Sequence, residues 1–287
     1  MSAIYKSEEG ERLVRERYLE MLTHWPVANE HLRVPTREGE TFVIVCGPRD
    51  APPVILLHGG LSNSFTWIGD VEAWAKHFRI YAVDIIGDGG LSAPSRPAYE
   101  SEAYALWLDD VLASLSLEKV AIVGISLGGW LALDYATRRP DRVTSLAMLC
   151  PGGVGRQKSG YLFKVLPLAL LGKWGRRKAM RIVLGPMNLP DPERARPAFE
   201  FFGLIGRHLK PRYEKLPVFS DEALRRLTMP VLTVVGGLDV MLDSDETKRR
   251  LEANVPTAEV IYLPNIGHGV VNQGTRVQDF LRRVLGV

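Results

Sequence analysis

Ser126 lies at the centre of the sequence GISLG, residues 124–128. An apolar run over residues 120–125 precedes this serine, and a helix-forming stretch follows it. A serine flanked by glycines between a strand and a helix is typical of a nucleophile elbow, a strained turn that exposes the hydroxyl and leaves no room for larger neighbours. The pattern therefore predicts Ser126 as a nucleophile.

A serine hydroxyl needs a base that removes its proton, and that base needs an acid partner that fixes its tautomer. Among six histidines, His268 lies in the sequence NIGHG, between the last predicted strand and the last helix. Asp239 follows the strand before and is the predicted acid. The nearby Asp243 and Asp245 are predicted instead to cap the helix that begins after them. A nucleophilic serine, a basic histidine and an orienting carboxylate are together suited to acyl-transfer chemistry.

Acyl transfer also requires donors that stabilise the oxyanion of its tetrahedral intermediate. The sequence HGGL, residues 58–61, follows an apolar run and is expected to turn back toward the serine. We predict the backbone amides of Gly60 and Leu127 as the two donors. His58 is predicted to form a hydrogen bond within its own loop rather than to take part in catalysis.

Neither the sequence motifs nor the composition indicate a cofactor or a charged macromolecular partner. No H-E-x-x-H, paired C-x-x-C or dinucleotide fingerprint occurs, so we predict no metal and no cofactor. The 36 Lys and Arg against 33 Asp and Glu give a net charge of +3, which does not indicate a nucleic-acid ligand. We expect a small-molecule substrate and a monomer or homodimer.

Six apolar runs alternate with helix-forming stretches along most of the chain. Runs this uniformly apolar suit strands that are covered on both faces, and their alternation with helices indicates crossover connections. The fold class is therefore α/β, with a mostly parallel doubly wound sheet whose carboxyl edge carries the site. The predicted strands cover residues 54–57, 80–84, 120–125, 146–150, 231–235 and 259–263, and the last helix covers 275–285.

Two further segments lie before this pattern, and one interrupts it. Residues 8–25 predict an N-terminal helix, and residues 31–35 and 41–46 predict an antiparallel hairpin. Residues 151–228 contain no convincing strand, and their helical stretches over 161–171, 176–184 and 198–207 predict a cap inserted after the sixth strand. Residues 1–150 and 229–287 then form the core. Candidate substrate-binding residues are Leu61, Phe163, Leu166 and Phe202.

Targeting and surface features indicate a cytoplasmic protein. No apolar run approaches the ~20 residues of a membrane span, and the N-terminus lacks the apolar stretch of a secretory signal, so the chain is expected unprocessed and without membrane insertion. Cys46 and Cys150 each close an apolar run, as buried reduced thiols do. Five Lys and Arg over residues 173–181 could attract an acidic substrate or a membrane surface, but are interpreted as a solvated helix face.

From about His31 to its end, the chain resembles the α/β-hydrolase superfamily and, more narrowly, bacterial carboxylesterases. The matching pieces are LLHGGLSNSFTW, YAVDIIGDGGLS, VGISLGG, VLTVVGGLD and NIGHG. One departure is that many relatives read D-x-x-G-x-G-x-S, whereas one extra residue lies between Asp84 and Ser92 here. The resemblance implies hydrolysis of carboxylic esters through an acyl-enzyme. Several other activities are found on similar sequences and stay as alternatives: carbon–carbon bond hydrolases, lactonases, perhydrolases and slow-turnover ligand receptors.

Overall fold

A single eight-stranded sheet runs through the molecule in the order β1-β2-β4-β3-β5-β6-β7-β8. The computed structural model describes residues 4–287, apart from the side chains of Ala169 and Arg194, so the predicted core residues 1–3 lie outside it. Only the pairs β1–β2 and β2–β4 are antiparallel. The strands are β1 (Asn29–Thr36), β2 (Gly39–Cys46), β3 (Pro53–Leu57), β4 (Arg79–Val83), β5 (Val120–Ile125), β6 (Val143–Leu149), β7 (Val231–Gly236) and β8 (Ala258–Leu263).

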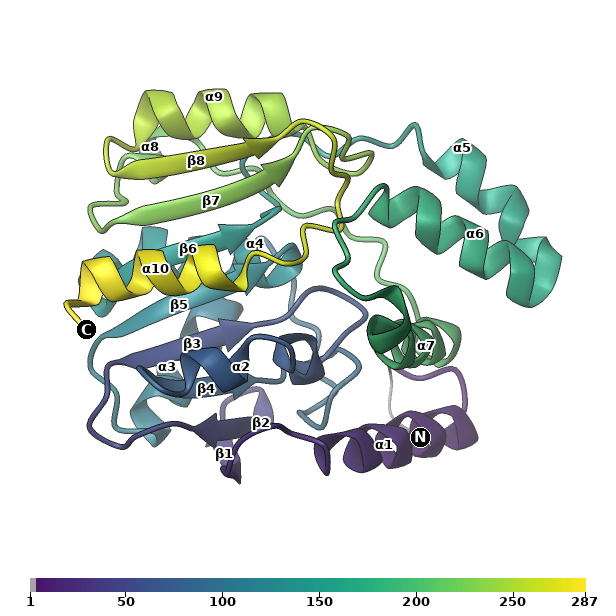
Figure 1. The fold of residues 1–287 in the computed structure, drawn as a ribbon, viewed down its shortest axis with the longest axis horizontal. Helices are drawn as coiled ribbons and strands as arrows, with labels where there is room; N and C mark the ends of the chain where they lie inside the picture. Colours follow the sequence, from purple (N-terminus) through teal and green to yellow (C-terminus); the bar gives the residue numbers. More distant parts are fainter. Residues whose placement is uncertain (1–3) are drawn as a thin grey trace.

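Helices cover both faces of the sheet, which explains the continuous apolar strands (Figure 1). In β3, Val54 and Leu56 belong to one core layer and Ile55 belongs to the other. The predicted doubly wound α/β fold is thus confirmed. The helices of the core are α1 (Glu8–Leu22), η1 (Ser64–Trp67), α2 (Val71–Trp74), α3 (Ala103–Ser114), α4 (Leu127–Arg138), η2 (Pro140–Arg142), α9 (Ser244–Asn254) and α10 (Gly274–Leu285).

The N-terminal helix is shorter than the predicted range of 8–25. It ends at Leu22, although Trp25 beyond it is still buried. Tyr18 on this helix stacks on Phe201, with ring centroids 5.9 Å apart. Its hydroxyl donates a hydrogen bond to the buried Asp84 carboxylate at 2.9 Å. The helix therefore packs between Phe201, in the segment after β6, and the core around Asp84.

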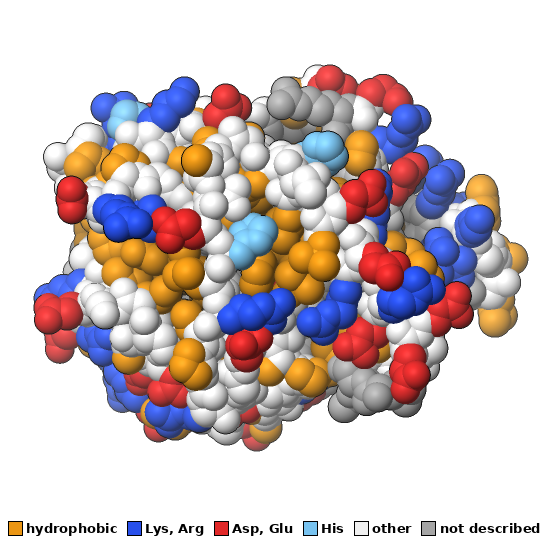
Figure 2. All heavy atoms as spheres, turned by 90° about the horizontal axis from the view of Figure 1, so that it is seen from below, with side chains coloured by type: hydrophobic (Ala, Val, Ile, Leu, Met, Phe, Trp, Pro, Cys, Tyr) orange, Lys and Arg blue, Asp and Glu red, His pale blue; other side chains and the backbone are white. Residues whose placement is uncertain are grey.

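All residues between β6 and β7 lie outside the sheet, as the sequence predicted. They form α5 (Leu162–Val165), η3 (Leu166–Leu171), α6 (Gly172–Leu184), α7 (Pro192–His208) and α8 (Asp221–Leu224). In Figure 1 the arrowheads of β7 and β8 point toward the side where α5, α6 and α7 lie. Figure 2 shows hydrophobic side chains, with Lys and Arg beside them, at the outermost right-hand end of the molecule. We call residues 151–228 the insertion.

The extra residue in the loop after β4 is accommodated around Asp84. Its carboxylate accepts hydrogen bonds from the amides of Ser64 and Leu91, at 2.9 and 2.8 Å. Ser92 donates its hydroxyl to the Asp84 carbonyl oxygen at 2.6 Å. The loop is thereby tied back to the end of its own strand and to the loop after β3.

Candidate active site

Ser126 occupies a strained turn between β5 and α4. Its φ of 51° and ψ of −105° lie outside the regions that non-glycine residues ordinarily adopt. The glycines beside it are required by close approach: a Cβ on Gly128 would lie 2.1 Å from the Leu57 carbonyl oxygen, and one on Gly124 would lie 2.4 Å from the Gly128 carbonyl oxygen. The local structure is the elbow that the sequence predicted.

The structure brings the three predicted polar residues together in one line of hydrogen bonds. His268 Nε2 lies 3.0 Å from Ser126 Oγ, and His268 Nδ1 lies 2.7 Å from Asp239 Oδ2. The other carboxylate oxygen of Asp239 accepts hydrogen bonds from the amides of Met241 and Leu242, at 2.7 and 3.0 Å. A carboxylate held this way is fixed in orientation, so the imidazole is aimed at the serine.

Asp243, the alternative acid, has a different role. It is the N-cap residue of α9, and its side chain accepts a hydrogen bond from the amide of Glu246 at 3.1 Å. A carboxylate at this position satisfies a free amide of the first turn and interacts favourably with the helix dipole. The predicted capping role of Asp243 is confirmed.

The loop that carries His268 is held by backbone bonds to the end of α6. The amide of Gly267 donates to the Pro186 carbonyl oxygen and the amide of Gly269 donates to the Leu184 carbonyl oxygen, each at 2.8 Å. A Cβ on Gly267 would lie 2.5 Å from the Leu184 carbonyl oxygen, which explains the glycine before the histidine. The insertion thus takes part in positioning His268, and no sequence motif predicts this contact.

The predicted oxyanion donors, Gly60 and Leu127, lie next to each other. A Cβ on Gly60 would be 3.7 Å from the Leu127 side chain, and one on Gly59 would be 3.9 Å from the Ser126 Cβ. Leu127 is the first residue of α4, so its amide has no acceptor within the helix and stands at the positive end of the helix dipole. The two backbone segments therefore lie close together beside the elbow, and their assignment as oxyanion donors stays a prediction.

Buried groups hold the turn that contains Gly60. His58 accepts a hydrogen bond at Nε2 from the amide of Ile85 at 2.9 Å, and its Nδ1 lies 2.7 Å from the Gly59 carbonyl oxygen. The predicted hydrogen bond of His58 within its own loop is confirmed. Asp88 accepts a hydrogen bond from the amide of Leu61 at 3.2 Å. Sequence reasoning missed Asp88, because its partners depend on the path of the loop.

Cys150 is a further neighbour of His268 that the sequence reasoning missed. Its Sγ lies 3.9 Å from His268 Nε2. The thiol is buried and forms no disulfide bond. The end of β6 lies between the ends of β5 and β7 in the sheet, so this neighbourhood was available from the strand order. Burial lowers the pKa of His268, whereas Cys150 and the Asp239 carboxylate raise it, and the net shift is well above 6.5.

The candidate substrate residues differ in their surroundings. Leu61 is exposed and adopts a positive φ of 56° beside Gly60. Phe163 and Leu166 are exposed on α5 and η3. Phe202, on α7, is partly buried and contacts Phe201, with ring centroids 6.1 Å apart. The assignment of these four residues to substrate binding stays a prediction.

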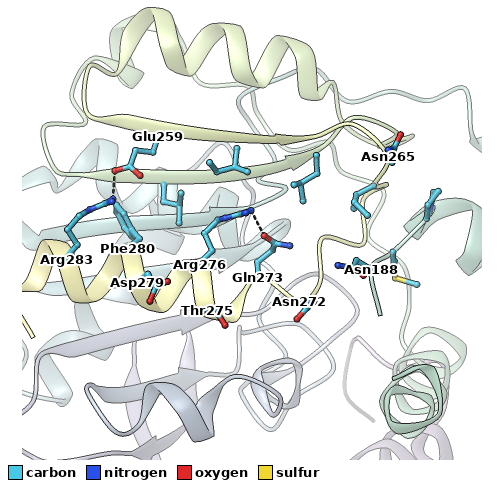
Figure 3. A pocket seen from close by; sticks show the side chains of 16 residues that line it. Asn188, Glu259, Asn265, Asn272, Gln273, Thr275, Arg276, Asp279, Phe280 and Arg283 are labelled. Carbon is cyan, nitrogen blue, oxygen red and sulfur yellow. Dashed lines mark hydrogen bonds and ion pairs between the residues drawn. The ribbon is translucent and has the colours of Figure 1, made fainter. Parts of the chain in front are cut away.

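No metal cluster accompanies this site in the described part of the chain. Within residues 4–287, no group of three or more His, Cys, Asp or Glu could hold a metal ion. A surface hollow lies between β8 and α10, with Leu232, Ile261 and Phe280 among its apolar lining (Figure 3). Its lining does not include Ser126, Asp239 or His268, so this hollow is separate from the chemistry described above.

This sheet, with a strained serine after its fifth strand and a histidine after its eighth, has the architecture of the α/β hydrolases. The family model described as alpha/beta hydrolase fold matches residues 52–177. The chain is 34% identical to an uncharacterized carboxylesterase, nap, of Bacillus subtilis (strain 168), over 93% of this chain and 90% of that protein. The chain therefore belongs to the α/β-hydrolase family.

Two solved structures from Bacillus subtilis have the same fold over nearly their whole length. Naproxen esterase, carboxylesterase NP, has a TM-score of 0.82 and is 32% identical, covering 98% of this chain and 99% of that chain. Carboxylesterase CesB (YbfK) has a TM-score of 0.81 and is also 32% identical, covering 96% and 98%. Both relatives carry the name of the activity that the resemblance implies.

Proposed function

We propose that this chain is a serine hydrolase that cleaves carboxylic esters of small molecules through an acyl-enzyme. The observation that carries the proposal is the unbroken line from Asp239 through His268 to Ser126, with contacts of 2.7 and 3.0 Å. The names of the two Bacillus carboxylesterases support the same reaction.

In the proposed mechanism, Ser126 Oγ bonds to the ester carbonyl carbon while its proton passes to His268 Nε2. The carbonyl oxygen becomes an oxyanion that the amides of Gly60 and Leu127 stabilise, a contribution of about 3 kcal/mol for a single donor. Asp239 holds the imidazole and stabilises its protonated form. The intermediate collapses, the carbon–oxygen bond to the alcohol breaks, and His268 gives its proton to that alcohol.

Deacylation repeats these steps with water. His268 takes a proton from water, the hydroxide oxygen bonds to the acyl carbon, and the proton then returns to Ser126 Oγ as the carboxylic acid leaves. No step requires a metal or an organic cofactor.

The insertion acts as a cap that sets the range of substrates in this proposal. Its contact with the loop of His268, through the carbonyl oxygens of Leu184 and Pro186, supports that role because the cap then adjoins the proposed base. Leu61, Phe163, Leu166 and Phe202 are proposed to contact the acyl or alcohol group. We further propose a monomer or homodimer in the cytoplasm, where the two free cysteines would stay reduced.

Steady-state hydrolysis of p-nitrophenyl esters of increasing chain length tests the proposal. Sustained turnover by the wild type and its loss in Ser126→Ala are expected. Ser62→Ala and Ser64→Ala are matched controls, because Ser62 lies in the loop after β3, Ser64 begins η1, and neither lies in the line of hydrogen bonds. A single stoichiometric release of p-nitrophenol without turnover would instead identify a ligand receptor on this fold.

A further inference from the structure

The first half of the insertion has a strongly one-sided charge. Residues 156–190 contain eight Lys and Arg and no Asp or Glu, although the whole chain is nearly balanced at 36 against 33. We call these residues the basic segment. Its cations are Arg156, Lys158, Lys164, Lys173, Arg176, Arg177, Lys178 and Arg181.

The same segment exposes an unusual share of large apolar side chains. In the described part of the chain, twelve large hydrophobic residues are exposed, and six of them lie between residues 162 and 174. Leu170 is 88% exposed, Phe163 is 84% exposed and Trp174 is 60% exposed. Scattered single apolar residues need no explanation, but a contiguous exposed group on a soluble fold marks an interaction surface.

On α6, the exposed Trp174 shares one surface with three of these cations. On α6, Trp174, Arg177, Lys178 and Arg181 follow the i, i+3, i+4, i+7 spacing of one helix face and line one surface hollow. Lys178 Nζ lies 4.9 Å from the Trp174 ring centroid. This surface therefore offers an aromatic ring surrounded by cations.

Two of these eight cations bond to acidic residues elsewhere in the chain. Arg156 pairs with Glu246 at 3.0 Å, and Lys158 donates to the Asp239 carbonyl oxygen at 3.2 Å. Among the residues described, the other six form no ion pair with a carboxylate. Unpaired cations beside exposed leucine, phenylalanine and tryptophan are the composition of a helix that lies at a lipid–water interface.

We propose that the basic segment is a docking surface for an anionic lipid bilayer. The exposed Leu170 and Leu171 at the end of η3 and Trp174 at the start of α6 enter the boundary between headgroups and acyl chains, and the cations contact lipid phosphates. A second copy of the chain is a poorer occupant, because its own basic segment would bring eight further cations against these eight. The exposed leucines likewise favour lipid over nucleic acid, because the bases of a nucleic acid stack on aromatic side chains rather than on leucine.

Docking here requires no spanning segment. Within residues 4–287, no helix is long and apolar enough to cross a bilayer. Within the segment, the end of α6 adjoins the loop of His268, so a docked molecule would hold its carboxyl sheet edge close to the lipid. The interpretation of residues 173–181 as only a solvated helix face changes accordingly, because the exposed apolar neighbours could not be known from the spacing of charges.

Co-sedimentation of the full chain with vesicles tests the proposal. We expect binding to phosphatidylcholine vesicles that contain about one third phosphatidylglycerol, little binding to pure phosphatidylcholine, and a decrease as salt screens the cations. Arg176→Glu/Arg177→Glu should lower the partition coefficient at least about tenfold, since each cation near an anionic surface contributes about fivefold and this variant removes two. Leu170→Ser/Trp174→Ser should lower it through lost apolar contact.

Arg225→Glu/Arg226→Glu is the matched control. It changes the net charge by the same amount but lies after α8, outside the basic segment. This control should bind nearly as the wild type does, and all variants should hydrolyse a soluble p-nitrophenyl ester at the wild-type rate. Because docking does not require hydrolysis, Ser126→Ala should also bind, which separates failure of this proposal from failure of the proposed reaction.

Three results would overturn the proposal. One is equal binding to neutral and anionic vesicles, and another is equal loss of binding in the control and the charge-reversed variants. The third is a concentration-dependent dimer, seen by light scattering, that Leu170→Ser/Trp174→Ser abolishes, because that result would assign the apolar surface to a second copy of the chain.

Discussion

The carboxylate of Asp88 accepts a hydrogen bond from the amide of Leu61 at 3.2 Å, one residue past the proposed oxyanion donor Gly60. Its second oxygen accepts the amide of Gly89 at 2.9 Å, and burial raises the pKa of the carboxyl to about 6. Leu61 itself has a positive φ of 56°, a conformation that surrounding contacts must maintain. Asp88 is therefore a positioning residue for the turn that presents Gly60.

Asp88→Asn should lower kcat about tenfold and leave KM nearly unchanged. The side-chain nitrogen of asparagine cannot accept, so one of the two amides loses its acceptor and the turn at Gly60 relaxes. The loss is expected to be smaller than the 10²- to 10³-fold cost of removing an oxyanion donor outright. Asp70→Asn is a matched control, because burial raises the pKa of Asp70 to about 6 as well. Unchanged kcat in Asp88→Asn, or an equal loss in the control, would contradict this role.

Asp239→Asn should keep the fold and lower kcat about 10⁴-fold, because a neutral side chain no longer enforces the imidazole tautomer. Asp243→Asn is the comparison, since its carboxylate caps α9 and is expected to affect stability by about 1 kcal/mol or less. Steady-state kinetics and thermal unfolding of both variants separate the two roles. The opposite pattern, with Asp243→Asn inactive, would refute the assignment of the acid.

Activity should fall as the pH decreases through a midpoint above 6.5. His268 accepts a proton only when it is neutral. Its pKa is raised well above the ordinary value, so a higher pH is needed to deprotonate the imidazole. The pH dependence of kcat/KM reports this ionisation in the free protein. A midpoint at or below 6.5 would show that burial, which lowers the pKa, outweighs Asp239 and Cys150.

Cys150→Ala is the companion measurement. The sulfur lies 3.9 Å from His268 Nε2 and contributes to the raised pKa, so its removal should move the midpoint of the pH profile downward. The line from Asp239 to Ser126 does not pass through Cys150, so activity at high pH should persist. A midpoint that moves upward in Cys150→Ala would contradict this account of the His268 pKa.

Apolar runs predicted the sheet well because its strands are buried on both faces. The predicted range 120–125 is β5 itself, whereas β6 begins at Val143, three residues before its predicted start. Thr144 and Ser145 hide this start, because polar residues inside a buried strand break the apolar pattern. Pro197 likewise hid the first turns of α7, which runs from Pro192 and retains that proline within the helix.

Some contacts of the site could likewise be predicted from the sequence, and others could not. Ser126, Asp239 and His268 could be grouped from sequence, because the carboxyl ends of parallel strands meet at one edge. The strand order places Cys150 at the same edge, but its contact with His268, like the partners of Asp88, depends on loop paths and side-chain directions. The bonds from the His268 loop to Leu184 and Pro186 involve backbone atoms alone, which leave no pattern in residue types.

The most direct test of the central claim is the site of covalent labelling. A sulfonyl fluoride or phosphonate reagent should modify one serine, inactivate the protein in proportion to labelling, and yield a single adduct that mass spectrometry places on Ser126. His268→Ala should label far more slowly, because no base then takes the serine proton. An adduct on Ser62, Ser64 or any residue other than Ser126, with matching loss of activity, would contradict the account.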